Sequence, residues 1–263
     1  MDTSPAFGIC HLSVVPLRSE ANDRAAQVSQ LLFGETFEIL EQQEKWTRVR
    51  GTWDDYEGWI DHKQYVVLTD GVEAYAPAFP AVATDLVNPV LTAAGEMIPV
   101  LLGSTLPRYN GDQVYINEQE YTFLGKSAVS ASAAVQGRLE EYAFHFLHAP
   151  YLWGGRSLFG IDCSGFVQVV YKILGYRLRR DAWQQAEQGT LVNFLEEAQP
   201  GDLAFFDNEE ERIIHVGIVL DDHKIIHASG KVRVDVLDHQ GIFNVDTKRY
   251  SHKLRIIKRV LQV

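Results

Sequence analysis

Three side chains in the C-terminal half of the sequence have the types needed for covalent catalysis: Cys163, His215 and His227. A cysteine thiolate is a nucleophile, and a nearby imidazole can take its proton as a general base. A second imidazole, bonded to the other ring nitrogen of the first, can fix its tautomer and orientation. The set therefore indicates nucleophilic acyl transfer, provided that the fold brings the three residues together.

The position of Cys163 is the most informative feature of the sequence. Asp162 is a good N-cap residue that follows a turn at Gly160, so we expect a helix whose first residue is Cys163. At that position the positive end of the helix dipole lowers a thiol pKa, and unpaired backbone amides can bind an oxyanion. Glycines at positions 154, 155, 160 and 165 surround the cysteine and make a purely structural thiol a weaker interpretation.

The two histidines lie in apolar segments that read as strands, residues 213–220 and 224–228. A lone histidine in such a strand is more often a core residue than a catalytic one. Side chains alternate along a strand, so the length of the connecting turn decides which faces they share. The three-residue turn 221–223 predicts both imidazoles on one face, whereas a two-residue turn would separate them.

The elements around these residues predict an α+β domain. Helix-period apolar residues occur over 135–149, 163–174 and 182–188. Strand patterns follow over 203–206, 213–220, 224–228, 232–237 and 254–261. Helices first and strands afterwards favour helices packed on an antiparallel sheet.

The N-terminal half reads as β structure. Short strands are expected over 12–17, 26–32, 36–41, 46–50 and 58–60, which suits a small barrel. Residues 72–126 carry five prolines and weaker strand patterns over 72–76, 100–102 and 113–116. The small polar residues at 126–134 are typical of a linker.

Composition excludes several classes of protein. The 263 residues carry a formal net charge of −11, which disfavours nucleic acid as a partner. There is no apolar run long enough for a membrane span and no secretory signal pattern, so no membrane partner and a cytoplasmic location are expected. The two cysteines exclude a disulfide framework and a CxxC motif, and Cys10 reads as a structural thiol. His145, His148 and residues 221–223 lack metal-ligand spacing, so neither a metal nor a cofactor is expected.

Five separated motifs, in this order, give the sequence a family resemblance: GIDCSGFVQVVY, LRRDAWQQAEQG, PGDLAFF, HVGIVL and IIHASG. Residues 135–263 resemble the NlpC family of bacterial cell-wall cysteine peptidases, also called the p-sixty group, which implies a papain-like α+β fold. The segments PLRSEANDRAAQVSQLLFGE and WTRVRGTWDDYEGWID resemble bacterial SH3-like domains. The whole layout is similar to γ-D-glutamyl-L-diamino acid endopeptidases. It implies an SH3-like domain at 1–70, a second SH3-like β domain at 71–127 and the catalytic domain at 128–263.

The resemblance also implies roles for individual residues. Cys163 would be the nucleophile, His215 the base and His227 the orienting residue, in agreement with the reasoning from the residues themselves. Several residues would bind substrate: Glu20, Tyr56 and Asp162 at its free amine, Tyr151 near the oxyanion, and Ser164 and Arg156 nearby. Ala182 stands where many relatives have a serine, and Asp181 or Trp183 would replace that contact.

These observations predict a cysteine endopeptidase that hydrolyses the γ-D-glutamyl to diamino acid bond of murein peptides with a free N-terminal L-alanine. Such an enzyme would serve the recycling of cell-wall peptides, with a small murein peptide as its binding partner. The alternative is a non-catalytic cell-wall peptide-binding protein in which SH3-like modules bind. The complete set of Cys163, His215 and His227 argues against it. The sequence leaves open the oligomeric state and the choice between meso-diaminopimelate and L-lysine.

Overall fold

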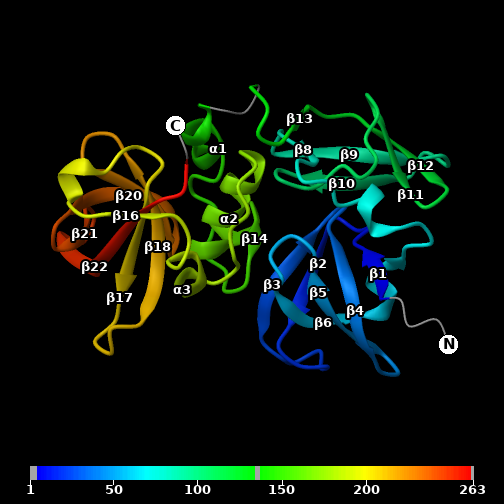
Figure 1. Cartoon of the computed structure of the whole chain (residues 1–263), viewed down its shortest axis with the longest axis horizontal. Coiled ribbons are helices and arrows are strands. Elements are labelled where there is room, and N and C mark those ends of the chain that lie inside the picture. Colours follow the sequence, from blue (N-terminus) through cyan, green and yellow to red (C-terminus); the bar gives the residue numbers. More distant parts are fainter. Residues whose placement is uncertain (1–4, 134–136, 262–263) are drawn as a thin grey trace.

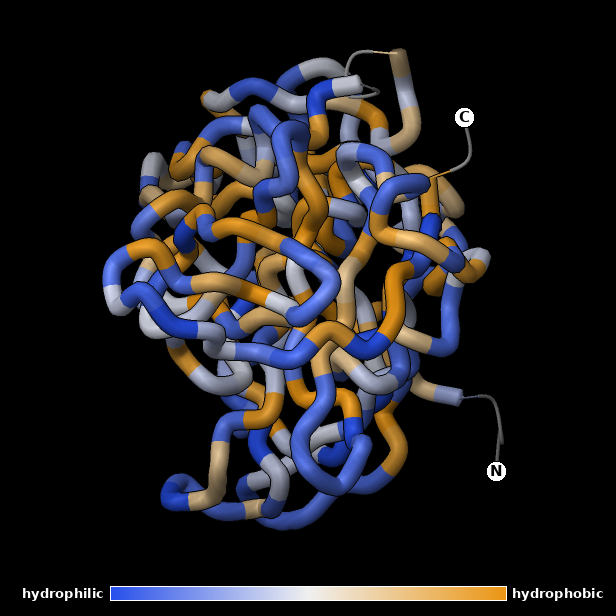
Figure 2. Tube along the Cα trace, turned by 90° about the vertical axis from the view of Figure 1, so that its left-hand side faces the viewer, coloured by the Kyte–Doolittle hydropathy of each residue, from blue (hydrophilic) through white to orange (hydrophobic). Residues whose placement is uncertain are grey.

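The computed structural model describes residues 5–133 and 137–261. The helices lie in the middle of the molecule, between a C-terminal barrel on one side and the N-terminal sheets on the other (Figure 1). Apolar segments run through the interior, while the outer loops are mostly hydrophilic (Figure 2). None of the helices in the described ranges is long and apolar enough to span a membrane.

The N-terminal sheet has the strand order β3-β2-β6-β5-β4-β1-β7. Its strands are β1 (Ala6–Ile9), β2 (Val14–Arg18), β3 (Gln27–Leu32), β4 (Thr36–Gln42), β5 (Trp46–Gly51), β6 (Glu57–Asp61) and β7 (Val66–Val67). The five expected strands are present, and burial alternates along β2 and β6 as the pattern requires. Strands β1 and β7 were not expected, and within the described residues the end strands β3 and β7 do not pair to close a barrel.

The second β unit consists of a sheet of order β10-β9-β12-β11 and a separate β8–β13 ribbon. Its strands are β8 (Ala81–Ala83), β9 (Val87–Thr92), β10 (Met97–Leu101), β11 (Gln113–Ile116), β12 (Gln119–Phe123) and β13 (Ser127–Val129). Its core includes Ile9, Phe33 and Leu68 from the first unit, so the two units pack as one body. Its resemblance to a second SH3-like domain stays a prediction.

Two expectations for this region were wrong. The segment Val72–Ala74 is a 3₁₀ turn, η2, rather than a strand, because its backbone closes on itself between Val72 and Tyr75. The expected linker 126–134 contains β13, which pairs with β8. A short polar strand of this kind is held by its partner strand and carries little signal of its own.

The helices of the C-terminal part are α1 (Leu139–Phe144), α2 (Cys163–Ile173) and α3 (Ala182–Gln185). Helix α2 agrees with expectation, whereas α1 and α3 are shorter than predicted. The chain leaves α1 in turns before Pro150, which disfavours helix at the preceding residue, and Gly189 has a positive φ after α3. Two further 3₁₀ turns are η1 (His62–Gln64) and η3 (Leu195–Glu197).

The C-terminal strands pair antiparallel throughout, as predicted, but the sheet closes on itself. Within the described residues, the order β22-β17-β18-β19-β20-β21 returns to β22 and forms a barrel, and β16 adds to its edge. The strands are β16 (Thr190–Val192), β17 (Leu203–Asp207), β18 (Ile213–Leu220), β19 (Lys224–Ser229), β20 (Lys231–Asp238), β21 (Gly241–Asn244) and β22 (Arg249–Arg259), with a small β14 (Arg156–Ser157) and β15 (Gly160–Ile161) ribbon outside.

Closure of the barrel is a feature that the expected antiparallel sheet did not include. Strand β22 is long enough to pair with β21 along its first half and with β17 along its second half. A register shift in each pairing bends the sheet at that point. Alternate residues of β18 then face in opposite directions: Val216 and Ile218 pack with α2, and Val219 packs inside the barrel.

Candidate active site

Helix α2 begins at Cys163, as the sequence predicts. Asp162 has extended backbone angles and its carboxylate accepts hydrogen bonds from the amides of Gly165 (2.7 Å) and Gly154 (2.8 Å). The first bond caps the helix, and the second fixes the glycine loop before it. Cys163 is 6% exposed and lies on the wall of a cavity.

The thiol of Cys163 is neutral in the resting protein. Burial raises its pKa to about 12, the charge of Asp162 acts in the same direction, and a hydrogen bond with the Val216 backbone offsets only part of the effect. The expectation that the helix N-terminus would lower this pKa was therefore wrong, because desolvation outweighs the helix end. Such a cysteine needs a base that removes its proton during attack.

The hairpin of β18 and β19 places His215 and His227 on one face, as the three-residue turn predicts. Gly217 pairs with His227, so the two histidines are diagonal neighbours. Nε2 of His215 lies 2.8 Å from Nδ1 of His227, and both rings are buried. Burial lowers the pKa of His215 well below its usual value, which keeps the ring neutral and able to accept a proton.

His215, the candidate base, directly precedes Val216 in β18, and the backbone of Val216 contacts the thiol of Cys163. Among the described residues the thiol of Cys163 and the ring of His215 share no hydrogen bond in this resting arrangement. Catalytic hydrogen bonds often tighten only when substrate binds.

Two residues that the sequence reasoning missed complete this cluster. Oδ2 of Asp235, on β20, lies 3.1 Å from Nε2 of His227. His252, on β22, stacks on His215 with ring centroids 4.1 Å apart. Burial lowers the pKa of His252 to about 4, so it is neutral. The only available signal was strand alternation, which puts Asp235 on the same face of β20 as Arg233, the partner of His227 in the sheet.

Ring nitrogens of His215, His227 and His252 all lie within 4.8 Å of one another, a donor set that a metal ion could use. Two of these rings are already joined by the His215–His227 hydrogen bond, and His215 and His252 are stacked, so their in-plane lone pairs lie in nearly parallel planes. A metal would have to displace the bonding proton and rotate a ring. The arrangement fits proton transfer better than metal binding.

A cavity of about 390 Å³ opens beside Cys163. Its walls come from both halves of the chain. They are formed by Val28, Tyr56, Trp153, Asp162, Cys163, Ser164, Asp181, Ala182, Trp183, Ile213 and Ile214. The N-terminal sheet therefore limits what can approach the thiol.

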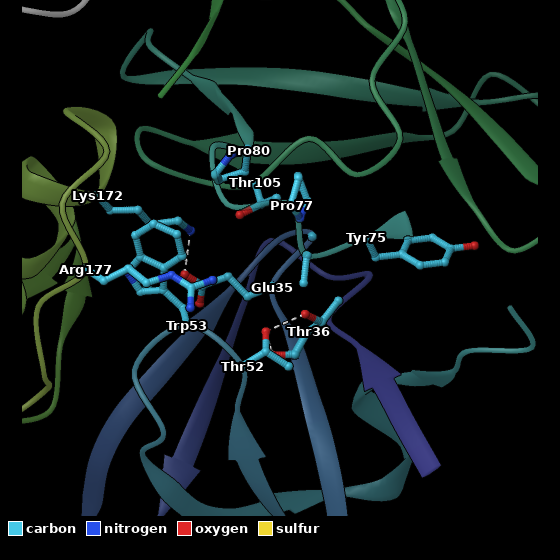
Figure 3. Close-up of a pocket in the computed structure, with 12 residues that line it drawn as sticks. Glu35, Thr36, Thr52, Trp53, Tyr75, Pro77, Pro80, Thr105, Lys172 and Arg177 are labelled. Atoms are coloured by element: carbon cyan, nitrogen blue, oxygen red, sulfur yellow. Dashed lines mark hydrogen bonds and ion pairs between the residues drawn. The ribbon is translucent and has the colours of Figure 1, made fainter. Parts of the chain in front are cut away.

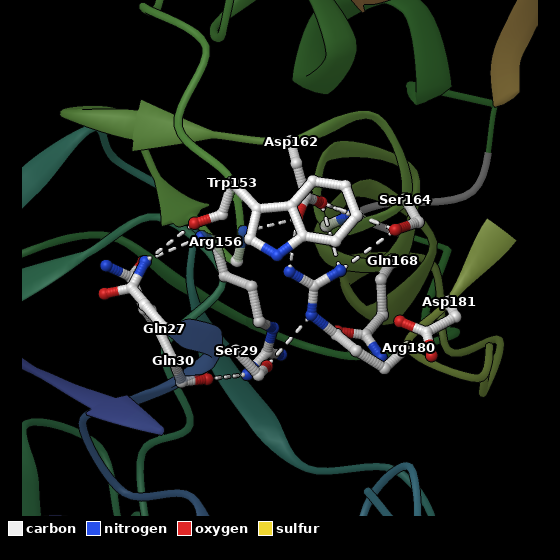
Figure 4. Close-up of polar contacts among 12 residues, drawn as sticks. Gln27, Ser29, Gln30, Trp153, Arg156, Asp162, Ser164, Gln168, Arg180 and Asp181 are labelled. Carbon is white, nitrogen blue, oxygen red and sulfur yellow. Dashed lines mark hydrogen bonds and ion pairs between the residues drawn. The ribbon is translucent and has the colours of Figure 1, made fainter. Parts of the chain in front are cut away.

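Asp162 is bound by Arg180, a third residue that the sequence reasoning missed. The guanidinium donates to both carboxylate oxygens at 3.0 and 2.6 Å, to Ser164 Oγ and to Ser29 Oγ of the N-terminal sheet (Figure 4). Arg180 is 1% exposed. The negative charge of Asp162 is thus already paired, which leaves it a weak site for a substrate amine. In the sequence, the Arg-Arg-Asp run before α3 was the feature that could have indicated an arginine at this position of the site.

Asp181 and Tyr56 both line the cavity and are joined by a hydrogen bond. The Tyr56 hydroxyl donates to Asp181 Oδ1 at 3.3 Å. Burial raises the pKa of Asp181 above its usual value and that of Tyr56 to about 12. Tyr151 is half-buried, and burial with the nearby Cys163 and Asp162 raises its pKa to about 12, so its phenol stays a donor.

Three predicted substrate-binding residues are not part of the cavity wall: Glu20, Arg156 and Tyr151, of which Tyr151 still lies close enough to Cys163 for their charges to interact. Glu20 is in the exposed turn between β2 and β3 and is not part of the wall. Arg156 is 2% exposed and binds Glu35 through two hydrogen bonds at 2.7 and 2.9 Å. Lys172 donates to the same carboxylate (Figure 3). Arg156 therefore joins the catalytic part to the N-terminal sheet, a structural role that its neighbours in sequence do not indicate.

Comparison with known proteins gives matches to two families. Residues 148–251 match the NlpC/P60 family and residues 17–64 match the bacterial dipeptidyl-peptidase Sh3 domain. A γ-D-glutamyl-L-lysine dipeptidyl-peptidase of Bacillus subtilis is 32% identical over 229 residues, covering 76% of this chain and 71% of that protein. Dipeptidyl-peptidase 6 of Lysinibacillus sphaericus is 26% identical over 251 residues, covering 85% and 89%.

A solved structure has a similar fold over nearly the whole chain. The crystal structure of an NlpC/P60 family protein from Bacillus cereus matches with a TM-score of 0.81 at 21% identity. The match covers 97% of this chain and all of that one. The arrangement of the barrel, the helices and the N-terminal sheets is thus shared with a known protein.

Proposed function

Because this chain belongs to the NlpC/P60 family of peptidases, we propose that it is a cysteine endopeptidase that cleaves the γ-D-glutamyl to diamino acid bond of murein peptides. The proposal includes a requirement for a free N-terminal L-alanine and a role in recycling cell-wall peptides. One observation carries the proposal. Cys163 lines a cavity walled by both halves of the chain, and its sulfur contacts the backbone of Val216, which directly follows His215 of the bonded histidine pair.

The proposed chemistry begins with a neutral thiol and a neutral base. His215 takes the proton of Cys163 while the sulfur attacks the γ-carbonyl carbon, and the backbone amides at the start of α2 with the Tyr151 phenol surround the developing oxyanion. The protonated His215 then gives its proton to the departing amine of the diamino acid. Water attacks the thioester with His215 again as the base, which releases L-Ala-D-Glu and restores the thiol.

Recognition of the amine is assigned to the part of the cavity wall formed by Asp181 and Tyr56. An L-Ala-γ-D-Glu unit with its free ammonium needs a negative group at the far end of the cavity. Asp181, bonded by Tyr56, is a carboxylate that accepts no hydrogen bond from an arginine within the described residues, whereas Asp162 is paired with Arg180. Trp153, Trp183 and Val28 give the rest of the wall an apolar surface. An acyl group on the amine would remove the charge and enlarge the ligand.

Mass spectrometry of L-Ala-γ-D-Glu-meso-diaminopimelate after incubation tests the proposal. Wild type is expected to release L-Ala-D-Glu, and Cys163→Ala is expected to release none. The matched control is Cys10→Ser, which changes the other cysteine, fully buried 153 positions away in sequence, and is expected to retain activity. The L-lysine tripeptide as a second substrate compares the two diamino acids.

The N-acetylated tripeptide tests the role of the N-terminal sheet. Its cleavage is expected to be slower by about 100-fold or more, since its loss of charge and added bulk oppose two features of the wall. Equal cleavage of both peptides would remove the amine requirement from the proposal. Binding of the free tripeptide by calorimetry with no cleavage by wild type would instead support the non-catalytic binding protein.

A further inference from the structure

A buried chain of hydrogen bonds extends beyond the two histidines to a carboxylate. His215 Nε2 lies 2.8 Å from His227 Nδ1, and His227 Nε2 lies 3.1 Å from Asp235 Oδ2. The side chain of Asp235 is fully buried. Resting on the proposed function above, we propose that Asp235 is a positioning residue that sets the tautomers of both histidines and thereby makes His215 Nδ1 the base for Cys163.

The tautomers follow from the donors and acceptors along this chain. An ionised carboxylate only accepts, so His227 must carry its proton on Nε2. Its Nδ1 is then an acceptor, and His215 must carry its own proton on Nε2. The remaining nitrogen, His215 Nδ1, is unprotonated and able to take the thiol proton. A neutral group in place of Asp235 would not enforce this order.

Asp235 is held as an anion by groups on neighbouring elements. Arg233 donates Nε to Oδ2 at 2.6 Å and a terminal nitrogen to Oδ1 at 2.9 Å. The amide of Val245, in the loop after β21, donates to Oδ1 at 3.1 Å. The hydrogen bond from His227, together with those from Arg233 and Val245, holds the pKa of Asp235 at about 2 despite its burial. The carboxylate is therefore ionised at neutral pH.

The other titratable groups near the histidine pair do not take the place of Asp235 as its hydrogen-bonded anion. His252 contacts His215 through its ring face, and its Nδ1 lies 2.8 Å from Ser251 Oγ. Asp246 binds Arg233 at 2.9 Å from the solvent side, with its own side chain 70% exposed. Asp235 is thus the anion that contacts the histidine pair in the described part of the chain.

The substitution Asp235→Asn is expected to move the proton of each histidine from Nε2 to Nδ1. Each carboxylate oxygen accepts two hydrogen bonds, Oδ1 from Arg233 and Val245, and Oδ2 from Arg233 and His227. Of these donors only His227 can become an acceptor, by moving its proton to Nδ1, so the amide nitrogen is expected to face His227 and the amide oxygen to stay at the Oδ1 position. His227 then becomes protonated on Nδ1 and His215 on Nδ1, which blocks the base. We expect kcat for the tripeptide to fall by about 10⁴-fold, the size of effect that a wrong tautomer has in a Ser-His-Asp enzyme. KM is expected to change by less than about threefold, since no substrate contact is lost.

Nuclear magnetic resonance of ¹⁵N-histidine-labelled protein supplies a readout that a merely structural role would not move. In wild type, His227 and His215 are expected to carry their protons on Nε2, with assignment by His227→Gln, and in Asp235→Asn both protons are expected on Nδ1. The matched control is Asp246→Asn, which removes the exposed partner of Arg233 and is expected to keep wild-type kcat and tautomers.

The two proposals fail separately. If wild type cleaves the tripeptide and Asp235→Asn cleaves it equally fast, the positioning role is refuted while the peptidase stands. If wild type leaves the tripeptide intact, the proposed function fails, and the wild-type tautomers still decide the inference. A wild-type His227 protonated on Nδ1 would overturn it even if Asp235→Asn did not fold.

Discussion

Glu35 is the residue at which a single change should most weaken the joint between the N-terminal sheet and the catalytic part. Its carboxylate is 6% exposed and accepts hydrogen bonds from Arg156, Lys172 and the amide of Leu32. Glu35→Gln removes the negative charge and leaves two buried cations without an anion. Removing one partner of a buried ion pair costs about 3–5 kcal/mol, and we expect a loss in this range.

The shifted pKa gives an independent value for the same interaction. The two cations lower the pKa of Glu35 from 4.5 to about 2, against the effect of burial. A shift of this size corresponds to about 3 kcal/mol of stability from ionisation in the folded state. Because the folded pKa is the lower one, this stability is present above pH 4.5 and is lost as the pH falls toward 2.

Urea unfolding followed by circular dichroism at several pH values measures both effects. Glu35→Gln is expected to be less stable by about 3–5 kcal/mol at pH 7, with a difference from wild type that narrows between about pH 5 and 2. The control is Glu38→Gln, which loses an exposed pair with Arg50 and should cost less than about 1 kcal/mol. A loss below about 1 kcal/mol for Glu35→Gln, or the same dependence of stability on acid pH as in wild type, would show that the ion pairs of Glu35 contribute little to this joint.

Three further outcomes are expected. In a Cys10→Ser background, the rate of alkylation of Cys163 by iodoacetamide should keep rising through pH 9, because burial raises the pKa of Cys163 to about 12. A rate that is independent of pH above 7 would indicate a preformed thiolate. In a pH profile of kcat/KM, the acid limb should lie below pH 6.5, because burial lowers the pKa of His215 and keeps this ring neutral on acidification. An acid limb above pH 6.5 would contradict the assignment of His215 as the base. Arg180→Met should destabilise the protein by about 3–5 kcal/mol in urea unfolding, because it leaves Asp162 buried and unpaired, and a change within about 0.5 kcal/mol would mean that the pair contributes little.

The start of α2 and the histidine hairpin could be predicted from sequence because local rules govern both. Asp162 caps the helix through atoms three residues away, and a three-residue turn fixes the faces of His215 and His227 through strand alternation. The bulk of the strands followed from the same alternation. Strand β13 and the 3₁₀ turn η2 did not, because short segments take their conformation from partners elsewhere in the chain.

The protonation of the site depended on burial, which a sequence pattern does not specify. The helix N-terminus suggested an acidic thiol, yet enclosure by β18 and the N-terminal sheet raises the pKa of Cys163 instead. The same applies to Arg156, which looked like a substrate contact and is enclosed with Glu35, 121 positions earlier in the chain. Whether a charged side chain meets solvent or a counter-ion is decided by residues distant in sequence.

The candidate nucleophile, the histidine pair and the local elements that carry them follow from the amino-acid sequence, because each rests on contacts between near neighbours. Three features emerge only in the folded chain: the closed barrel of strands, the cavity wall that Tyr56 and Asp181 share, and the hydrogen bond that joins His227 to Asp235. Those features depend on which strands pair and how sheets pack, and the free energy of such packing is spread over many residues far apart in the chain.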